Sequence, residues 1–285
     1  MSQSSGVASS LQARAQEVVK EDLAEAKIQV NDAAKSGSYL YPIKGIFYFF
    51  SHRALWKPFL SRIGPTLAVS AGVTVPMFIF TYLPQLAILV WVNGPLAVFT
   101  TVLLVLNESS TITSIIARNF IMQDALLDTF DGTLVARGAT GVVKEGRELQ
   151  PGSDPIGKLG KVLKSPFDRF SPKAILRYLI HLPLNFIPVV GTVIFILLQG
   201  RARGQSVHDR YFQLKSWGKE RRSAWIQAHA GSYTAFGFVA TLLEMVPVAS
   251  LLFSCTNAVG AALWAADIEA KGTQTAGQAA SDKDN

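Results

Sequence analysis

The sequence contains an apolar run too long for an ordinary soluble domain to bury. From Ile63 to Asn107, 45 residues pass without Asp, Glu, Lys or Arg. A helix of about 20 residues crosses the roughly 30 Å of hydrocarbon in a bilayer, so this run suffices for two. The turn is expected at Asn93–Pro95, because Gly94 permits a positive φ and Pro95 suits a helix start. The run therefore predicts two membrane helices joined by a tight turn.

The composition also indicates membrane insertion. Of 285 residues, 49% are hydrophobic and 16% are charged, whereas about 25% are charged in typical soluble domains. The net charge of +7 favours anionic lipid headgroups over nucleic acid as the partner, because no nucleic-acid recognition motif accompanies it. The first 40 residues are polar, so a cleaved signal peptide is not expected. The single cysteine, Cys255, excludes an internal disulfide and argues against a thiolate metal cluster.

The two predicted membrane helices, about residues 63–117, differ in character. Pro76 and Pro84 lie inside the first helix and predict a kink. The second helix is expected to pass Glu108 and leave the membrane through "SIIARNFIMQDALLDTF". The polar, glycine- and proline-rich stretch 131–173 predicts a loop region outside the bilayer.

Two segments precede the membrane helices. In residues 1–38, a polar segment, apolar side chains recur every three or four positions, which predicts an amphipathic helix. Between Tyr39 and Phe59, aromatic side chains are interspersed with basic ones. Such a composition is typical of the headgroup layer, where amphipathic rings and cationic heads both find suitable surroundings.

The stretch "RYLIHLPLNFIPVVGTVIFILLQGRARG" poses a choice between crossing and re-entry. The 23 residues between Arg177 and Arg201 carry no charge, which is long enough for one crossing. A crossing would place its two net-positive flanks on opposite sides of the membrane, which the positive-inside bias disfavours. A half-membrane hairpin over 174–200 keeps both flanks on one side. Its tip is expected at Asn185, Pro188 and Gly191.

A second apolar region, 223–266, echoes this pattern. Glu244 precedes Pro247 by three positions, as Asn185 precedes Pro188. The arms around this second tip are longer, so full crossings remain an alternative to re-entry. At the tip, Glu244 is interpreted as either an ion site or a partner for backbone amides at a helix end. The glycine-, alanine- and glutamine-rich tail 267–285 is expected to be disordered.

A basic linker, 201–222, connects the two hairpins. It is interpreted either as a contact for anionic headgroups or anions, or as an anchor that fixes topology. Its seven cations are Arg201, Arg203, Arg210, Lys215, Lys219, Arg221 and Arg222.

Several of these motifs resemble one known family. "PIKGIFYFFSHRALWKPFL", "LPLNFIPVVGT" and "EMVPVASLLFSCTNAVGAALWA" resemble the etoposide-induced protein and CysZ superfamily over roughly Tyr41 to Ala266. The resemblance implies two long helices plus half-membrane hairpins. Its branches include bacterial sulfate permeases, an animal endoplasmic-reticulum protein and fungal outer spore wall proteins associated with lipid droplets. "DTFDGTLVARG" is most similar to the fungal branch. The permeases' Gly-Leu-Arg turn is absent, since Gly45 is followed by Ile46 and Phe47, which disfavours sulfate binding.

Glu108 is the candidate intramembrane polar site. A carboxylate inside a membrane helix is costly and usually has a reason. It is interpreted either as an ion or proton site, or as a group near a headgroup layer or hydrogen-bonded between helices. The four histidines are far apart and match no metal motif, and no nucleophile or phosphate-loop motif occurs. No enzyme activity, metal or cofactor is therefore expected.

The sequence thus predicts an all-α integral membrane protein with two long kinked transmembrane helices and re-entrant hairpins. All basic segments are expected on the cytosolic face, and the membrane domain covers 39–266. The first hypothesis is a non-enzymatic protein of the endoplasmic reticulum and lipid droplets that supports lipid handling or spore wall assembly. The alternative is a channel or permease for a small, sulfate-like anion. Membrane lipids are the expected partners, and self-association through hairpin tips is a further expectation.

Overall fold

The computed structural model describes residues 35–163, 199–246 and 249–281. Nearly all of the predicted amphipathic N-terminal segment, residues 1–38, lies outside the described residues. So does the predicted re-entrant hairpin with Asn185, Pro188 and Gly191, and so does Pro247 at the second tip. The re-entrant hairpin and self-association through tips therefore remain predictions.

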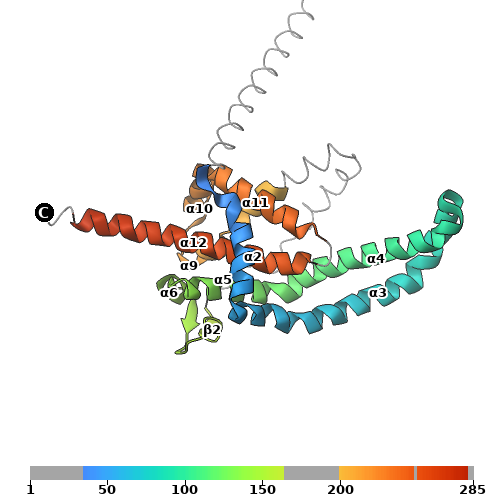
Figure 1. Cartoon of the computed structure of the whole chain (residues 1–285), viewed down its shortest axis with the longest axis horizontal. Coiled ribbons are helices and arrows are strands. Elements are labelled where there is room, and N and C mark those ends of the chain that lie inside the picture. Colours follow the sequence, from blue (N-terminus) through green and yellow to red (C-terminus); the bar gives the residue numbers. More distant parts are fainter. Residues whose placement is uncertain (1–34, 164–198, 247–248, 282–285) are drawn as a thin grey trace, which may run out of the picture.

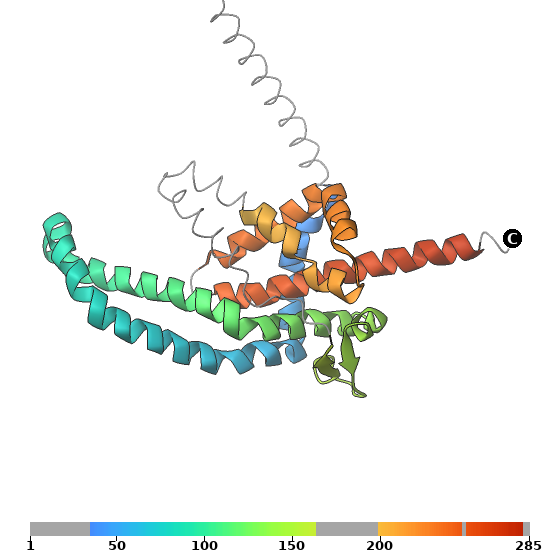
Figure 2. The same cartoon turned by 180° about the vertical axis from the view of Figure 1, so that it is seen from behind.

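Two long antiparallel helices form a hairpin that projects from a compact helical body (Figures 1 and 2). The first, α3 (Trp56–Asn93), continues through Pro65, Pro76 and Pro84. A short 3-10 turn, η3 (Gly94–Leu96), leads into α4 (Ala97–Ile116). Gly94 adopts a φ of 54° at this turn, in the left-handed region that favours glycine. The turn expected at Asn93–Pro95 is therefore confirmed.

The return arm of the hairpin continues without a break into the body. A π-helical segment, η4 (Ala117–Ile121), joins α4 to α5 (Met122–Ala136). The whole stretch Arg53–Ala136 is long and apolar enough to cross a membrane. A second stretch, Ser250–Gly272, also qualifies by length and composition, but most of it is buried inside the body.

Large apolar side chains cover the outside of the hairpin. Trp91, Phe80 and Phe99 are 90%, 74% and 71% exposed. An apolar surface this extensive is unfavourable in water and marks contact with lipid or protein. Between Arg62 and Arg118 the only charged residue is Glu108. At 1.5 Å per residue, the helical path from Arg62 to Trp91 is about 44 Å, which matches a bilayer with its headgroup regions.

The body is built around the C-terminal helix, α12 (Ser250–Ser281), which packs against α2, α5 and α11. A 3-10 turn, η1 (Ser38–Leu40), opens α2 (Tyr41–Ser51), and a second, η2 (Arg53–Leu55), joins α2 to α3. Three further helices of the body are α9 (Asp209–Leu214), α10 (Lys219–Ala228) and α11 (Ala230–Glu244). Figure 1 shows α2 running crosswise over α12, at the base of the hairpin.

The crossing of α2 and α12 depends on two glycines. A Cβ on Gly45 would lie 2.2 Å from the carbonyl oxygen of Thr256, and one on Gly260 would lie 2.4 Å from that of Tyr41. Such distances are possible only without a side chain, so the backbones touch. This contact fixes α2 against the body and directs its other face outward.

An aromatic cluster fills the core between α9, α11 and α12. At its centre, His208 is fully buried; its Nε2 lies 3.1 Å from the carbonyl oxygen of Ala261 and its Nδ1 lies 2.8 Å from the Tyr233 hydroxyl. Because a carbonyl only accepts, Nε2 carries the proton and Nδ1 accepts from Tyr233. Burial lowers the pKa of His208 to about 3, so the ring is neutral.

The stretch 131–173, expected as a loop, contains regular structure where it is described. Its first residues complete α5, and α6 (Thr140–Lys144) follows. Then β1 (Arg147–Leu149) pairs antiparallel with β2 (Leu159–Val162). The prediction of a loop from the polar composition was wrong here, because the apolar residues of this stretch pack onto the core. Over its described residues, the fold is mostly helical with one small β-hairpin.

The tail expected to be disordered from residue 267 begins as a helix. α12 continues to Ser281. Asp267 accepts a hydrogen bond of 2.8 Å from the Tyr41 hydroxyl, and Lys215 Nζ lies 3.1 Å from Glu269 Oε1. Alanine and glutamine are good helix formers, and these anchors order the first turns beyond the core.

Candidate functional site

Glu244 forms the centre of a charged site at the end of α11. Its side chain is 5% exposed, and its Oε1 accepts a hydrogen bond of 2.9 Å from Asn257 Nδ2. Arg118 Nη1 lies 2.6 Å from its other oxygen, Oε2, and the guanidinium of Arg203 contacts the same oxygen. One carboxylate is therefore shared between two arginines from distant parts of the chain.

Local backbone features bring the two arginines together. Arg118 lies in the π-helical turn η4, a kind of helix defect that is frequent at functional sites. Arg203 belongs to helical residues 199–206, which dock on α11 through glycines. A Cβ on Gly237 would lie 1.9 Å from the carbonyl oxygen of Gly200, and one on Gly204 would lie 2.0 Å from that of Tyr233. This close approach places Arg203 beside the end of α11.

A cavity of about 500 Å³, with both polar and apolar side chains in its wall, opens beside this carboxylate. Besides Arg118, Arg203 and Glu244, the polar and charged residues that line it are Asn119, Gln123, Gln199, Ser206, Asp209, Arg210, Ser254 and Asn257. Two guanidinium groups facing one carboxylate leave one net positive charge. Burial lowers the pKa of Arg203, while Glu244 opposes the shift and Arg118 adds to it. Arginine stays protonated in proteins all the same, so this group of three can attract an anion.

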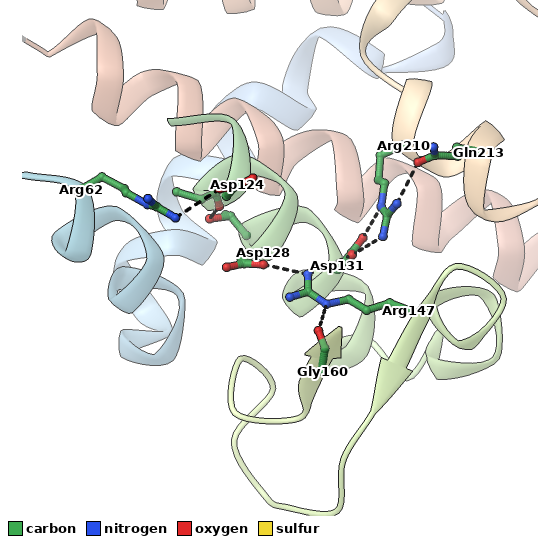
Figure 3. A network of polar contacts seen from close by, with 10 residues as sticks. Arg62, Asp124, Asp128, Asp131, Arg147, Gly160, Arg210 and Gln213 are labelled. Atoms are coloured by element: carbon green, nitrogen blue, oxygen red, sulfur yellow. Dashed lines mark hydrogen bonds and ion pairs between the residues drawn. The ribbon is translucent and has the colours of Figure 1, made fainter. Parts of the chain in front are cut away.

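A second buried network lies on the body side of α5 (Figure 3). Asp131 is fully buried and accepts two hydrogen bonds from Arg210, 2.9 Å from Nε and 2.6 Å from Nη2. Arg147 Nη1 lies 3.3 Å from Asp131 and 2.7 Å from Asp128, and its Nε donates to the carbonyl oxygen of Gly160 over 2.9 Å. Each charge has a partner, so this network joins α5, α9 and the β-hairpin.

Comparisons with known proteins identify the family of this chain. A family model described as "Sulfate transporter CysZ/Etoposide-induced protein 2.4" matches residues 41–254, most of the chain. The chain belongs to this family. Two relatives from Saccharomyces cerevisiae (strain ATCC 204508 / S288c) are similar to it. Outer spore wall protein RRT8 is 23% identical over 256 residues, covering 82% of this chain and 73% of its own length. Outer spore wall protein LDS1 is 22% identical over 244 residues, covering 83% and 72%.

In this member of the family, the predicted basic interfacial linker packs partly into the body. Arg210 is 4% exposed. Lys215 pairs with Glu269, and Arg222 Nη2 lies 2.5 Å from Asp209. The guanidinium carbon of Arg221 lies 4.3 Å from the centre of the Trp217 ring. Of the seven cations, Arg201, Lys219 and Arg221 are the exposed ones.

Glu108 has a partner inside the hairpin. Gln85 Nε2 on α3 donates a hydrogen bond of 2.8 Å to Glu108 Oε2 on α4. One interpretation of Glu108 from the sequence was a hydrogen bond between helices, and the structure contains this bond. The nearby Ser109 is buried on the same arm, and its hydroxyl lacks a partner among the described residues.

The sequence identified Glu244 and Arg203 but not the residues that complete the site. Arg118 and Asn257 were not identified from the sequence, because their contacts join positions far apart in the chain. Asp131 and Arg147 were hidden in a stretch expected to be a loop. Asp128 and Asp131 lie four and seven positions after Asp124, which is helical spacing, and this was the signal available. In the described ranges, no cluster of three His, Cys, Asp or Glu side chains could hold a metal ion.

Proposed function

We propose that this protein is a non-enzymatic integral membrane protein of the endoplasmic reticulum and lipid droplets that supports lipid handling or spore wall assembly. The α3–α4 hairpin carries this proposal. Its two arms expose an extensive apolar surface, and both ends join the same helical body. A hairpin of this kind returns the chain to the side from which it enters.

A protein on a lipid droplet must keep all its polar segments on the cytosolic side of the droplet surface. The droplet surface is a phospholipid monolayer with neutral lipid beneath, so no aqueous compartment exists for polar loops on the far side. In the endoplasmic reticulum, the same hairpin has enough length to span the bilayer. Every basic segment then lies on the cytosolic face in both membranes, as the positive-inside bias favours.

The two relatives support the biological process. Both are named outer spore wall proteins, and each matches over most of its length. At 22–23% identity the process is a proposal for this chain.

Droplet targeting tests the proposal. The tagged full-length protein is expected on droplet rims in lipid-loaded eukaryotic cells and in the endoplasmic reticulum otherwise. Phe80→Asp places a charge on the exposed face of α3, at a cost of about 3 kcal/mol at the membrane centre, and should abolish droplet targeting. The matched control is Leu163→Asp, because Leu163 is 57% exposed but follows β2 in the body. Equal targeting by both variants would contradict the proposal.

Cysteine labelling tests the sidedness. In a Cys255→Ser background, single cysteines at Ser36 and Lys144 flank the hairpin. An impermeant reagent applied from the cytosolic side is expected to label both. Labelling of one site with protection of the other would show that the hairpin does not return.

The second candidate is a permease for a small anion. The excess positive charge of Arg118 and Arg203 around Glu244, beside a cavity of about 500 Å³, favours it. Proteoliposomes containing the protein would then show anion flux above empty liposomes, and Arg118→Gln would reduce it. Flux equal to empty liposomes eliminates this candidate and leaves the first intact.

A further inference from the structure

The helix α2 has two opposite faces of different character. Pro42, Gly45 and Phe49 are buried against the body. On the opposite face, apolar side chains recur at spacings of three and four, and all are exposed. The exposed fractions are 39% for Leu40, 40% for Ile43, 69% for Phe47 and 51% for Phe50. Phe50 also makes an edge contact with the ring of Trp56, and Phe47 is the most exposed member of the stripe.

The position of α2 relates this stripe to the membrane. α2 runs crosswise to α3, at the base of the hairpin, in both views (Figures 1 and 2). Only the short η2 turn separates the end of α2 from the start of α3. If the α3–α4 hairpin stands in the membrane, α2 therefore lies along the membrane surface. The exposed stripe continues the apolar surface of the hairpin at the headgroup level.

A cavity of about 430 Å³ adjoins the same face. Its rim carries two cations, Lys44 from α2 and Arg137 from the end of α5, and one acid, Asp267. Arg137 Nη2 lies 3.2 Å from Asp267 Oδ1, and the Tyr41 hydroxyl donates to the other oxygen of that carboxylate. Phe47 and Tyr48 form the apolar part of the wall. Lys44, Arg137 and Asp267 together give the rim one net positive charge.

We propose that this cavity is a binding site for the headgroup of an anionic phospholipid, with α2 lying in the interfacial layer. The phosphate fits between Lys44 and Arg137, and the glycerol and upper acyl carbons contact Phe47 and the apolar stripe. Two features select this occupant over a protein partner: the excess positive charge of the rim and its continuity with the lipid-facing surface of α3. The inference rests on the proposed membrane insertion of the hairpin.

Fluorescence quenching in lipid nanodiscs tests the site. In the Cys255→Ser background, an environment-sensitive fluorophore is attached at Phe50→Cys, which lies on the stripe but not in the cavity wall. Trace phosphatidylserine or phosphatidylcholine carries a nitroxide on an upper acyl carbon. Phosphatidylserine should quench the fluorophore at several-fold lower mole fraction than phosphatidylcholine.

Charge variants give opposite expected changes. Lys44→Gln should lower the preference for phosphatidylserine about fivefold, as one cation near an anionic surface contributes, and Lys44→Arg should retain it. Asp267→Asn should raise the preference, because it removes the acid from the rim. Lys161→Gln, at an exposed position on β2, is the matched control and should change nothing.

The possible outcomes distinguish a failure of the headgroup site from a failure of the proposed function. A second fluorophore at Leu83→Cys reports insertion of the hairpin. Quenching at Leu83 without quenching at Phe50, or equal quenching by both lipids, overturns the headgroup site and leaves the hairpin proposal standing. Absence of quenching at Leu83 overturns both. A preference that Lys44→Gln leaves unchanged also overturns the site.

Discussion

Asp131 is the residue on which the packing of the body depends most directly. It is fully buried and receives hydrogen bonds from two arginines, Arg147 and Arg210. Burying charges is costly unless each is paired, and removing one partner leaves the other charges uncompensated. Here one carboxylate neutralises charge from the β-hairpin and from α9 at once.

Asp131→Asn should therefore destabilise the protein strongly, by about 3–5 kcal/mol. The measurement is the unfolding free energy or the thermal midpoint in detergent. Asp154→Asn is the matched control, because Asp154 pairs with Lys57 at the surface, over 2.5 Å, and such pairs contribute about 0–1 kcal/mol. Equal effects of the two substitutions would contradict the importance of the buried network.

His208 introduces a dependence of stability on pH. Its pKa is about 3 in the folded state and near 6.5 in an unfolded chain, so below pH 6.5 the unfolded state binds more protons. The stability contributed by the neutral ring is complete above pH 6.5 and is lost as the pH falls toward 3. The neighbouring Asp209 acts in the opposite direction, because burial raises its pKa to about 6.

Comparison with His208→Gln isolates the histidine, since Asp209 is present in both proteins. Below pH 6.5, the advantage of the wild type over this variant should shrink by about 1.4 kcal/mol per pH unit. Thermal midpoints in detergent at pH 7.5, 6.5 and 5.5 measure it. A difference that stays constant over this range would show that His208 is not buried as a neutral ring.

At the scale of elements, the segment 201–222 combines cations with two different roles. Arg210 is enclosed by the body, whereas Arg201 and Lys219 are exposed. A run of basic residues in a sequence does not distinguish these roles, because the partner of Arg210 lies 79 positions earlier in the chain. Helical periodicity does not predict such a pairing.

Charge removal at these positions should separate the roles. Arg201→Gln with Lys219→Gln should weaken binding to anionic vesicles in a graded, salt-sensitive way while the thermal midpoint stays unchanged. Arg210→Gln should lower the thermal midpoint instead. Vesicle flotation at two salt concentrations, alongside thermal unfolding, checks both. If Arg210→Gln changed only vesicle binding, the assignment of Arg210 to the core would be wrong.

The glycines between residues 199–206 and α11 provide a test of packing. Gly237→Ala should displace this helical segment, because its Cβ would overlap the backbone of Gly200. Gly64→Ala in α3 is the control, since nothing lies within 4 Å of the new Cβ there. Yield of folded protein and thermal midpoint should fall only for Gly237→Ala.

For the whole molecule, the sequence predicted what depends on neighbours in the chain and missed what depends on distant contacts. The hairpin turn at Gly94 was predictable, because glycine and proline specify a turn locally. Glu244 was recognisable as a charge inside an apolar region. Its partner Arg118 was not, because it lies 126 residues earlier. The helical continuation of α12 past Asp267 likewise depends on Tyr41, at the other end of the domain.

The π-helical turn η4 sets the rotational phase between the hairpin and the body. α4 and α5 belong to one continuous helix, yet one presents its apolar side chains to the outside and the other presents them to the core. The wider π-helical turn between them changes the direction in which the following side chains point. The apolar side chains of α4 can therefore face outward while those of α5 face the core. Deleting one residue from η4 would rotate α4 by about 100° relative to α5. A single-codon deletion would thereby uncouple lipid contact from the Arg118–Glu244 pair, although it alters neither composition nor charge beyond that one residue.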